Sequence, residues 1–134
     1  MISKQEKGRC GEQLALEAYE KLGYALVGQN YRCRWGEIDL IVKNDVFFVF
    51  CEVKLRNGTR FGSGLDAVTP AKREKIIKSA QQFLCDYPVS SNLQLRFDVF
   101  AIQIEEKHDK ILVQSTELIE NAFEVVDRGY DSIF

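Results

Sequence analysis

Two neighbouring segments carry acidic side chains within otherwise apolar sequence. Gly36-Glu37-Ile38-Asp39-Leu40 contains two acids, and Glu52-Val53-Lys54 follows a long apolar run. Charged side chains destabilise apolar strands unless they are paired or bind a metal. Carboxylate oxygens suit Mg²⁺ or Mn²⁺, and Mg²⁺ is commonly held by one or two carboxylates plus substrate phosphate. The pattern indicates a metal-dependent phosphodiesterase in which a cation relieves the repulsion between the acids, and Lys54 orients water or stabilises the charged transition state.

A two-residue turn at Asn44-Asp45 would place these acids on one face of a hairpin. In that register Asp39 lies opposite Phe50, and Glu37 lies opposite Glu52. Asp39 and Glu52 are then diagonal neighbours, about 7–8 Å apart between their backbones. A slip by one residue would move Asp39 to the other face, so the predicted site depends on the register.

The helices and strands that must position these groups follow from the apolar periodicity. We predict, in chain order, a helix over 3–22, strands over 24–34, 36–42 and 47–54, a helix beginning at Thr69-Pro70, strands over 93–104 and 111–113, and a short helix over 118–126. The third and fourth strands flank a crossover helix and should be parallel. The expected fold is α/β, a mixed sheet in αβββαβ order flanked by helices.

Length and charge set limits on the function. The chain has 134 residues, an apolar fraction of 46% and a net charge of −2, which speaks against nonspecific coating of nucleic acid. Residues 1–99 hold 15 Lys or Arg and 12 Asp or Glu, whereas residues 100–134 hold 3 and 8. We therefore expect one domain over 1–134, with its core at about 4–104 and an acidic C-terminal extension at about 105–134.

The remaining composition indicates a cytoplasmic protein. No apolar run approaches the roughly 20 residues of a membrane-spanning helix, and the N-terminal segment is too polar for a signal peptide. The four cysteines form no CxxC pair, which disfavours a zinc site and favours reduced, mostly buried thiols.

The spacing of Asp39 and Glu52-Val53-Lys54, with twelve residues between them, resembles the PD-(D/E)xK nuclease motif. A wider set of segments resembles the YraN family of small bacterial proteins, which is related to archaeal Holliday-junction resolvases: Gly11-Glu12, Gly23-Tyr24, Asn30-Tyr31-Arg32, Gly36 to Leu40, Glu52 to Lys54 and Arg96-Phe97-Asp98. The resemblance implies a restriction-endonuclease-like core. Ile38 stands where the motif name has proline.

The resemblance also implies a role for each matching residue. Asp39, Glu52 and Glu12 would bind the metal together with the Val53 carbonyl, and Lys54 would be the catalytic lysine. Glu37 would accompany the aspartate rather than bind. The implied activity is Mg²⁺- or Mn²⁺-dependent cleavage of branched or structured DNA, and the implied assembly is a twofold homodimer.

Basic side chains surround the predicted site in the sequence. Those we assign to phosphate binding are Arg56, Arg60, Lys72 and Arg73, with a solvated helix face as the alternative. Asp98 is expected to pair with Arg96. Trp35 and Tyr31 either stack on bases or are buried, and we favour burial.

Two other functions remain open at this point. The chain is either a non-catalytic module that keeps the fold and binds nucleic acid or a protein, or a structural protein with acids scattered over its surface. Convergence of Glu12, Asp39 and Glu52 in three dimensions would count against scattered acids.

Overall fold

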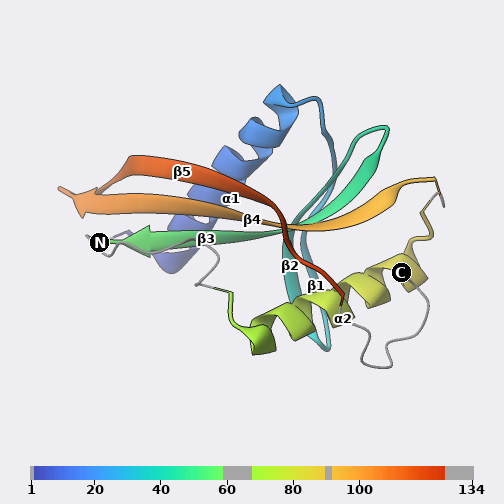
Figure 1. Cartoon of the computed structure of the whole chain (residues 1–134). Coiled ribbons are helices and arrows are strands. Elements are labelled where there is room, and N and C mark those ends of the chain that lie inside the picture. The colour runs from blue at the N-terminus through green and yellow to red at the C-terminus, as the bar shows by residue number, and fades with distance from the viewer. Residues whose placement is uncertain (1, 59–67, 90–91, 126–134) are drawn as a thin grey trace.

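The computed structural model describes residues 2–58, 68–89 and 92–125. Its elements are helix α1 (Lys4–Lys21), strands β1 (Ala25–Cys33), β2 (Gly36–Lys43) and β3 (Phe47–Asn57), helix α2 (Pro70–Asp86), and strands β4 (Gln94–Lys107) and β5 (Lys110–Phe123). The sheet has the order β1-β2-β3-β4-β5 (Figure 1). Strands β3 and β4 are parallel, and the other neighbouring pairs are antiparallel. The predicted α/β fold with a mixed, helix-flanked sheet is confirmed.

The two helices of the described chain cover opposite faces of the sheet (Figure 1). In β3, Phe48 and Phe50 pack into the apolar cluster around α2, whereas Val49 and Cys51 pack into the cluster around α1. This alternation follows from the two-residue period of a strand. Because both faces are covered, β3 is apolar along most of its length, and its charged residues come at its carboxyl end.

Helix α1 approaches β3 closely at Gly11. A Cβ atom at Gly11 would overlap Leu55 Cδ1 and lie 3.1 Å from Val53 Cγ1. Ser3 caps the helix, because its Oγ accepts a hydrogen bond from the Glu6 amide at 3.1 Å. The close approach brings Glu12, the next residue, to the end of the sheet where the acids of β2 and β3 lie.

Helix α2 begins where the sequence predicts. Thr69 Oγ1 accepts a hydrogen bond from the Lys72 amide at 3.3 Å, and Pro70 occupies the first turn. The helix buries Ile76, Ile77, Ala80 and Phe83 against the sheet. As the crossover between β3 and β4, it completes the predicted βαβ unit.

The predicted register of β2 and β3 is wrong by two residues. Lys43 pairs with Phe48 rather than Val46, and Leu40 pairs with Cys51. The reason is a longer turn: the Asn44 side chain accepts hydrogen bonds from the amides of Val46 and Phe47, at 2.9 and 2.7 Å. A shift of two leaves the side chains of the paired residues, Leu40 to Lys43, on their predicted faces.

The C-terminal segment forms one long strand instead of a short strand followed by a helix. Strand β5 pairs with β4 from Lys107↔Lys110 to Phe97↔Phe123. The predicted helix over 118–126 is therefore wrong as far as Phe123, and Val126 lies outside the described residues. The backbone N–H and C=O groups at the edge of β4 form hydrogen bonds with this segment. These hydrogen bonds stabilise a strand more than the weak local helix preference stabilises a helix.

All four cysteines are free, and only Cys51 is buried, so the expectation of mostly buried thiols is wrong. Among the residues that the structure describes, no helix is long and apolar enough to span a membrane.

Candidate metal centre

Strand β2 is irregular at Asp39. Ile38 packs in the apolar cluster of α2 and Leu40 in that of α1, although residues two apart in a regular strand share a face. The Asp39 side chain points toward β3, where its Oδ2 accepts a hydrogen bond from the Val53 amide at 2.8 Å. The backbone pairing of β2 and β3 ends at Leu40↔Cys51. Just beyond it, the Asp39 carboxylate oxygen accepts the hydrogen bond that a backbone carbonyl of β2 would accept in a regular sheet.

The neighbouring strand is irregular at the same level. Asn30 has a positive φ of 52° and lies between the paired residues Gln29↔Leu40 and Tyr31↔Ile38. Asparagine tolerates this left-handed conformation better than most residues. Its side-chain amide donates a hydrogen bond to Glu12 Oε2 at 2.9 Å. Asn30 therefore fixes the position of a carboxylate that helix α1 delivers from another part of the chain.

Three carboxylates converge as a result. One ligand oxygen each from Glu12, Glu37 and Asp39 lies within 4.8 Å of the others, and all three residues are half-buried. They lie in a cleft of about 590 Å³ whose other lining residues include the cations Lys4, Arg9 and Arg32. Glu37 was not predicted as a ligand. Its position two residues before Asp39 was the available signal, since alternate residues of a strand often share a face.

Glu52 and Lys54 adjoin this cluster from β3. The Glu52 carboxylate lies 3.3 Å from Lys54 Nζ and interacts electrostatically with the Asp39 carboxyl group. Burial raises the pKa of Glu52, while the charge of Lys54 opposes the shift. The structure thus brings together Glu12, Asp39, Glu52 and Lys54 of the predicted set. Val53 contributes its amide to Asp39, and ligation by its carbonyl stays a prediction.

The electrostatics of the cluster favour a cation. Burial raises the pKa of Asp39 to about 8, and the Glu52 carboxylate is the second cause. The Val53 amide opposes this shift, whereas Glu37 and Glu12 add to it. The raised pKa values of Asp39 and Glu52 both favour a proton within this pair. A divalent cation would relieve the same repulsion that the proton relieves.

The predicted phosphate-binding residues have different surroundings. Lys72 is exposed on the first turn of α2, and the adjacent Lys54 ammonium lowers its pKa. Arg73 is engaged within the fold: its Nε donates to the Val68 carbonyl at 2.9 Å, and its guanidinium lies over Phe123. Arg56 is half-buried on β3. Arg60 lies outside the described residues.

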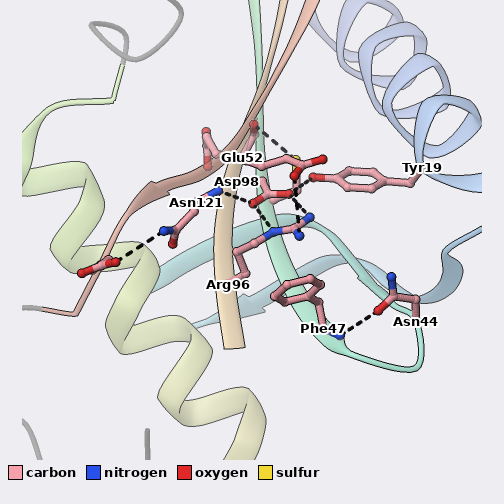
Figure 2. Close-up of polar contacts among 10 residues, drawn as sticks. Tyr19, Asn44, Phe47, Glu52, Arg96, Asp98 and Asn121 are labelled. Atoms are coloured by element: carbon pink, nitrogen blue, oxygen red, sulfur yellow. Dashed lines mark hydrogen bonds and ion pairs between the residues drawn. The ribbon is translucent and has the colours of Figure 1, made fainter. Parts of the chain in front are cut away.

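A buried polar network holds α1 against the sheet (Figure 2). Asp98 is fully buried and accepts hydrogen bonds from the Tyr19 hydroxyl at 2.7 Å and from the Arg96 guanidinium at 2.9 Å on each oxygen. The backbone N–H of Asn121 donates a further hydrogen bond to Asp98 at 2.9 Å. Burial, with Cys51 and Asp98 nearby, raises the pKa of Tyr19, so the phenol keeps its proton and donates. The expected Arg96–Asp98 pair is present and is part of this larger structural network.

Removing the Asn30 side chain is expected to weaken metal binding. Asn30→Gly keeps the left-handed backbone but leaves Glu12 without its donor, and loss of such a supporting hydrogen bond typically lowers metal affinity about 10–100-fold. Titration calorimetry with Mn²⁺ measures the change. Asn121→Gly is the matched control, because Asn121 also has a positive φ (51°) and its side chain contacts Glu124 instead. Equal affinities of wild type and Asn30→Gly would contradict the assigned role.

The raised pKa of Asp39 predicts a pH-dependent stability in the presence of a chelator. Between the ordinary pKa near 4 and the folded value of about 8, the folded protein holds a proton that the unfolded chain has released. Stability is therefore lost as pH rises through this window, by at most about 1.4 kcal/mol per pH unit. Asp39→Asn should flatten the loss. Urea unfolding at pH 5 and pH 8 measures it, and parallel wild-type and variant profiles would contradict the prediction.

The fold is a mixed sheet flanked by two helices in the part of the chain that the structure describes. Helix α1 and strands β2 and β3 bring carboxylates together beside a lysine, and this arrangement is consistent with a nuclease-like core. The family model that matches is that of the uncharacterised protein family UPF0102, over residues 11–102. This chain belongs to that family, and the resemblance to YraN-like proteins is thereby confirmed.

Curated relatives agree with this assignment. A UPF0102 protein of Legionella pneumophila strain Corby is 46% identical over 107 residues, covering 80% of this chain and 89% of its own length. A UPF0102 protein of Nitrosococcus oceani is 41% identical over 108 residues, covering 81% and 87%. A protein of Acinetobacter baumannii strain SDF is 38% identical over 130 residues, covering 92% and 98%. Their names state the family and no activity.

Proposed function

We propose that this protein is a metal-dependent endonuclease that hydrolyses phosphodiester bonds in branched or structured DNA. The observation that carries the proposal is the convergence of Glu12, Glu37 and Asp39, with the Glu52–Lys54 pair of β3 adjoining them. These carboxylates come from three different elements, and burial, followed by the charge of Glu52, raises the pKa of Asp39. Acids scattered over a surface would not show this mutual approach.

The donor set fits Mg²⁺ or Mn²⁺. All the converging donors are carboxylate oxygens, and hard divalent cations prefer such ligands in a polar, partly hydrated site. Glu12, Glu37 and Asp39 would hold the ion, with Glu52 adjoining them from β3. A bound divalent ion supplies Lewis-acid polarisation of a phosphoryl oxygen and lowers the pKa of water.

The chain's own side chains then account for the remaining requirements of hydrolysis. Lys54 is held by Glu52 at 3.3 Å, with its side chain 25% exposed, so its ammonium can donate to water or to a phosphoryl oxygen at the cluster. Hydrogen-bond donors placed where negative charge develops are among the largest contributors to catalysis. Asn30 and the Val53 amide keep Glu12 and Asp39 in place without adding negative charge.

The substrate class rests on the surrounding charge and on the resemblance stated above. Lys4, Arg9 and Arg32 line the cleft together with the acids, and Lys54 and Lys72 interact with Glu52. Cations around an acidic metal site suit a phosphate backbone. The preference for branched DNA and the twofold assembly follow from the resemblance to junction resolvases, since a four-way junction has nearly twofold symmetry.

Cleavage assays test this function. Labelled four-way junction, flap, single-stranded and duplex DNA would be incubated with Mg²⁺, Mn²⁺ or a chelator. We expect cleavage with either metal, none with the chelator, and loss of activity in Asp39→Asn and Glu52→Gln. Glu20→Gln, which changes an exposed acid at the far end of α1, is the matched control.

The alternative, a non-catalytic binding module with the same fold, gives a different result. It predicts binding of DNA or a protein without metal-dependent cleavage of any of the four substrates. Cleavage that survives both Asp39→Asn and Glu52→Gln would instead indicate a contaminating nuclease and remove the support for this site.

A further inference from the structure

The turn between β1 and β2 lies against helix α2. Arg34 and Trp35 form this turn, and Gly36 follows with a φ of 147°. A Cβ atom at Gly36 would lie 3.7 Å from Ser79 Oγ and 3.9 Å from Lys75 Cβ. The turn is thus placed beside the middle of α2, about one helical turn beyond Lys72.

Two cations contact the indole ring of Trp35. Arg34 Cζ lies 4.3 Å from the ring centroid, and Lys78 Nζ lies 4.8 Å from it. Such cation–π contacts restrain long basic side chains that would otherwise move freely. Since the half-buried ring is already in contact with two cations, it orients charges rather than offering a free face to a base.

The basic side chains form a continuous row from the acidic cluster to this turn. Lys72 lies beside Lys54, and Lys75 is exposed one turn further along α2. Glu74 is the one acid between Pro70 and Ala80, and it lies 3.8 Å from Lys78. From Lys72 to Lys78 the helix advances about 9 Å, which matches about two to three nucleotides at 3.4 Å each.

We propose that Arg34 and Lys78, held by Trp35, form a second phosphate-binding site for the nucleic-acid strand whose scissile phosphate lies at the acidic cluster. This inference rests on the proposed function and adds a location to it. The strand runs along α2 from Lys54, and its backbone about two to three nucleotides away contacts the Trp35 turn. Trp35 is a positioning residue, because it acts through the two cations.

Binding measurements in the absence of cleavage test the proposal. The Asp39→Asn variant would be titrated, in a chelator, with a fluorescently labelled single strand and a labelled four-way junction over a range of salt concentrations. Adding Arg34→Gln or Lys78→Gln should each raise Kd about 3–10-fold at low salt and reduce the salt slope by about 1. Lys110→Gln, an exposed cation on the distant β4–β5 turn, is the matched control and should change neither.

The role of the indole is tested separately. Trp35→Leu should weaken binding about as much as the loss of one cation, and Trp35→Phe should restore most of the affinity, because phenylalanine keeps a ring for cation–π contact. Trp35 is the single tryptophan of the chain, so its fluorescence in the otherwise unchanged Asp39→Asn protein should change when DNA is added.

Two outcomes would overturn the proposal in distinguishable ways. If Asp39→Asn binds DNA and the double variant Arg34→Gln/Lys78→Gln leaves Kd and the salt slope unchanged, the second site is wrong while the proposed function stands. If neither wild type with Ca²⁺ nor Asp39→Asn binds any of the probes, both the second site and a nucleic-acid substrate are wrong.

Discussion

Replacing Lys54 by alanine is expected to lower the rate of metal-dependent cleavage about 100- to 1,000-fold. The ammonium lies 3.3 Å from Glu52 at the acidic cluster, where negative charge would develop on the phosphoryl group in the proposed reaction. Loss of one well-placed donor to such a charge typically has an effect of this size. Single-turnover cleavage at saturating protein concentration measures the chemical step, while Mn²⁺ calorimetry should show that the metal still binds.

The conservative variant and a control separate chemistry from general charge. Lys54→Arg should retain a small part of the activity, because a planar guanidinium keeps the charge but not the compact geometry of the ammonium. Lys43→Ala, at the opposite end of the β2–β3 hairpin, should cleave at the wild-type rate. A Lys54→Ala rate within a few-fold of wild type would remove Lys54 from the catalytic role.

Asp98→Asn is expected to lower the free energy of unfolding by about 3–5 kcal/mol. The carboxylate is fully buried and balances the guanidinium of Arg96, which is itself only 6% exposed. Burial would lower the pKa of Arg96, but the hydrogen bonds and charge of Asp98 outweigh it and raise that pKa overall. Breaking one partner of a buried pair leaves the other charge uncompensated. Urea denaturation with and without the substitution measures the loss.

Two further variants show whether the pair itself or its disruption matters. Glu120→Gln removes a carboxylate that lies 3.8 Å from Arg96 but is 53% exposed, and should change stability by less than about 1 kcal/mol. The double variant Arg96→Met/Asp98→Leu should recover only the part of the loss that comes from the uncompensated charge. The Tyr19 hydroxyl and the Asn121 backbone N–H would still lack their acceptor. A loss in Asp98→Asn as small as that in Glu120→Gln would show that the network contributes little.

Local sequence patterns were enough to predict most of the fold. Thr69-Pro70 marks the start of α2, and its position between two apolar strands predicts the parallel pair β3–β4. The error in the β2–β3 register came from the Asn44 side chain, which closes a longer turn with the amides of Val46 and Phe47. Because the error was an even number of residues, the predicted faces of Leu40 to Lys43 survived it, whereas the direction of Asp39 depends on the irregularity of β2 at that residue.

The details of the candidate site depend on contacts between distant segments and were harder to predict. Strand β2 is irregular at Asp39, and Asn30, opposite it on β1, has a left-handed backbone. The asparagine itself is the strongest local sequence signal for either irregularity. Together the two irregularities place Glu37 beside Glu12. The long strand β5 was missed for a similar reason, since the edge of β4, not the local sequence, determines its conformation.

The Tyr19–Asp98 hydrogen bond has a consequence for how the protein matures during translation. It joins residues 79 positions apart, so the ribosome must release β4 before α1 has its anchor. Chains are synthesised from the N-terminus at about 5–20 residues per second, which leaves the helix carrying Glu12 without this hydrogen bond for several seconds. A nascent chain therefore contains all four acids of the cluster before α1 has this anchor, so the proposed metal site would be fully held in place only after β4 has emerged.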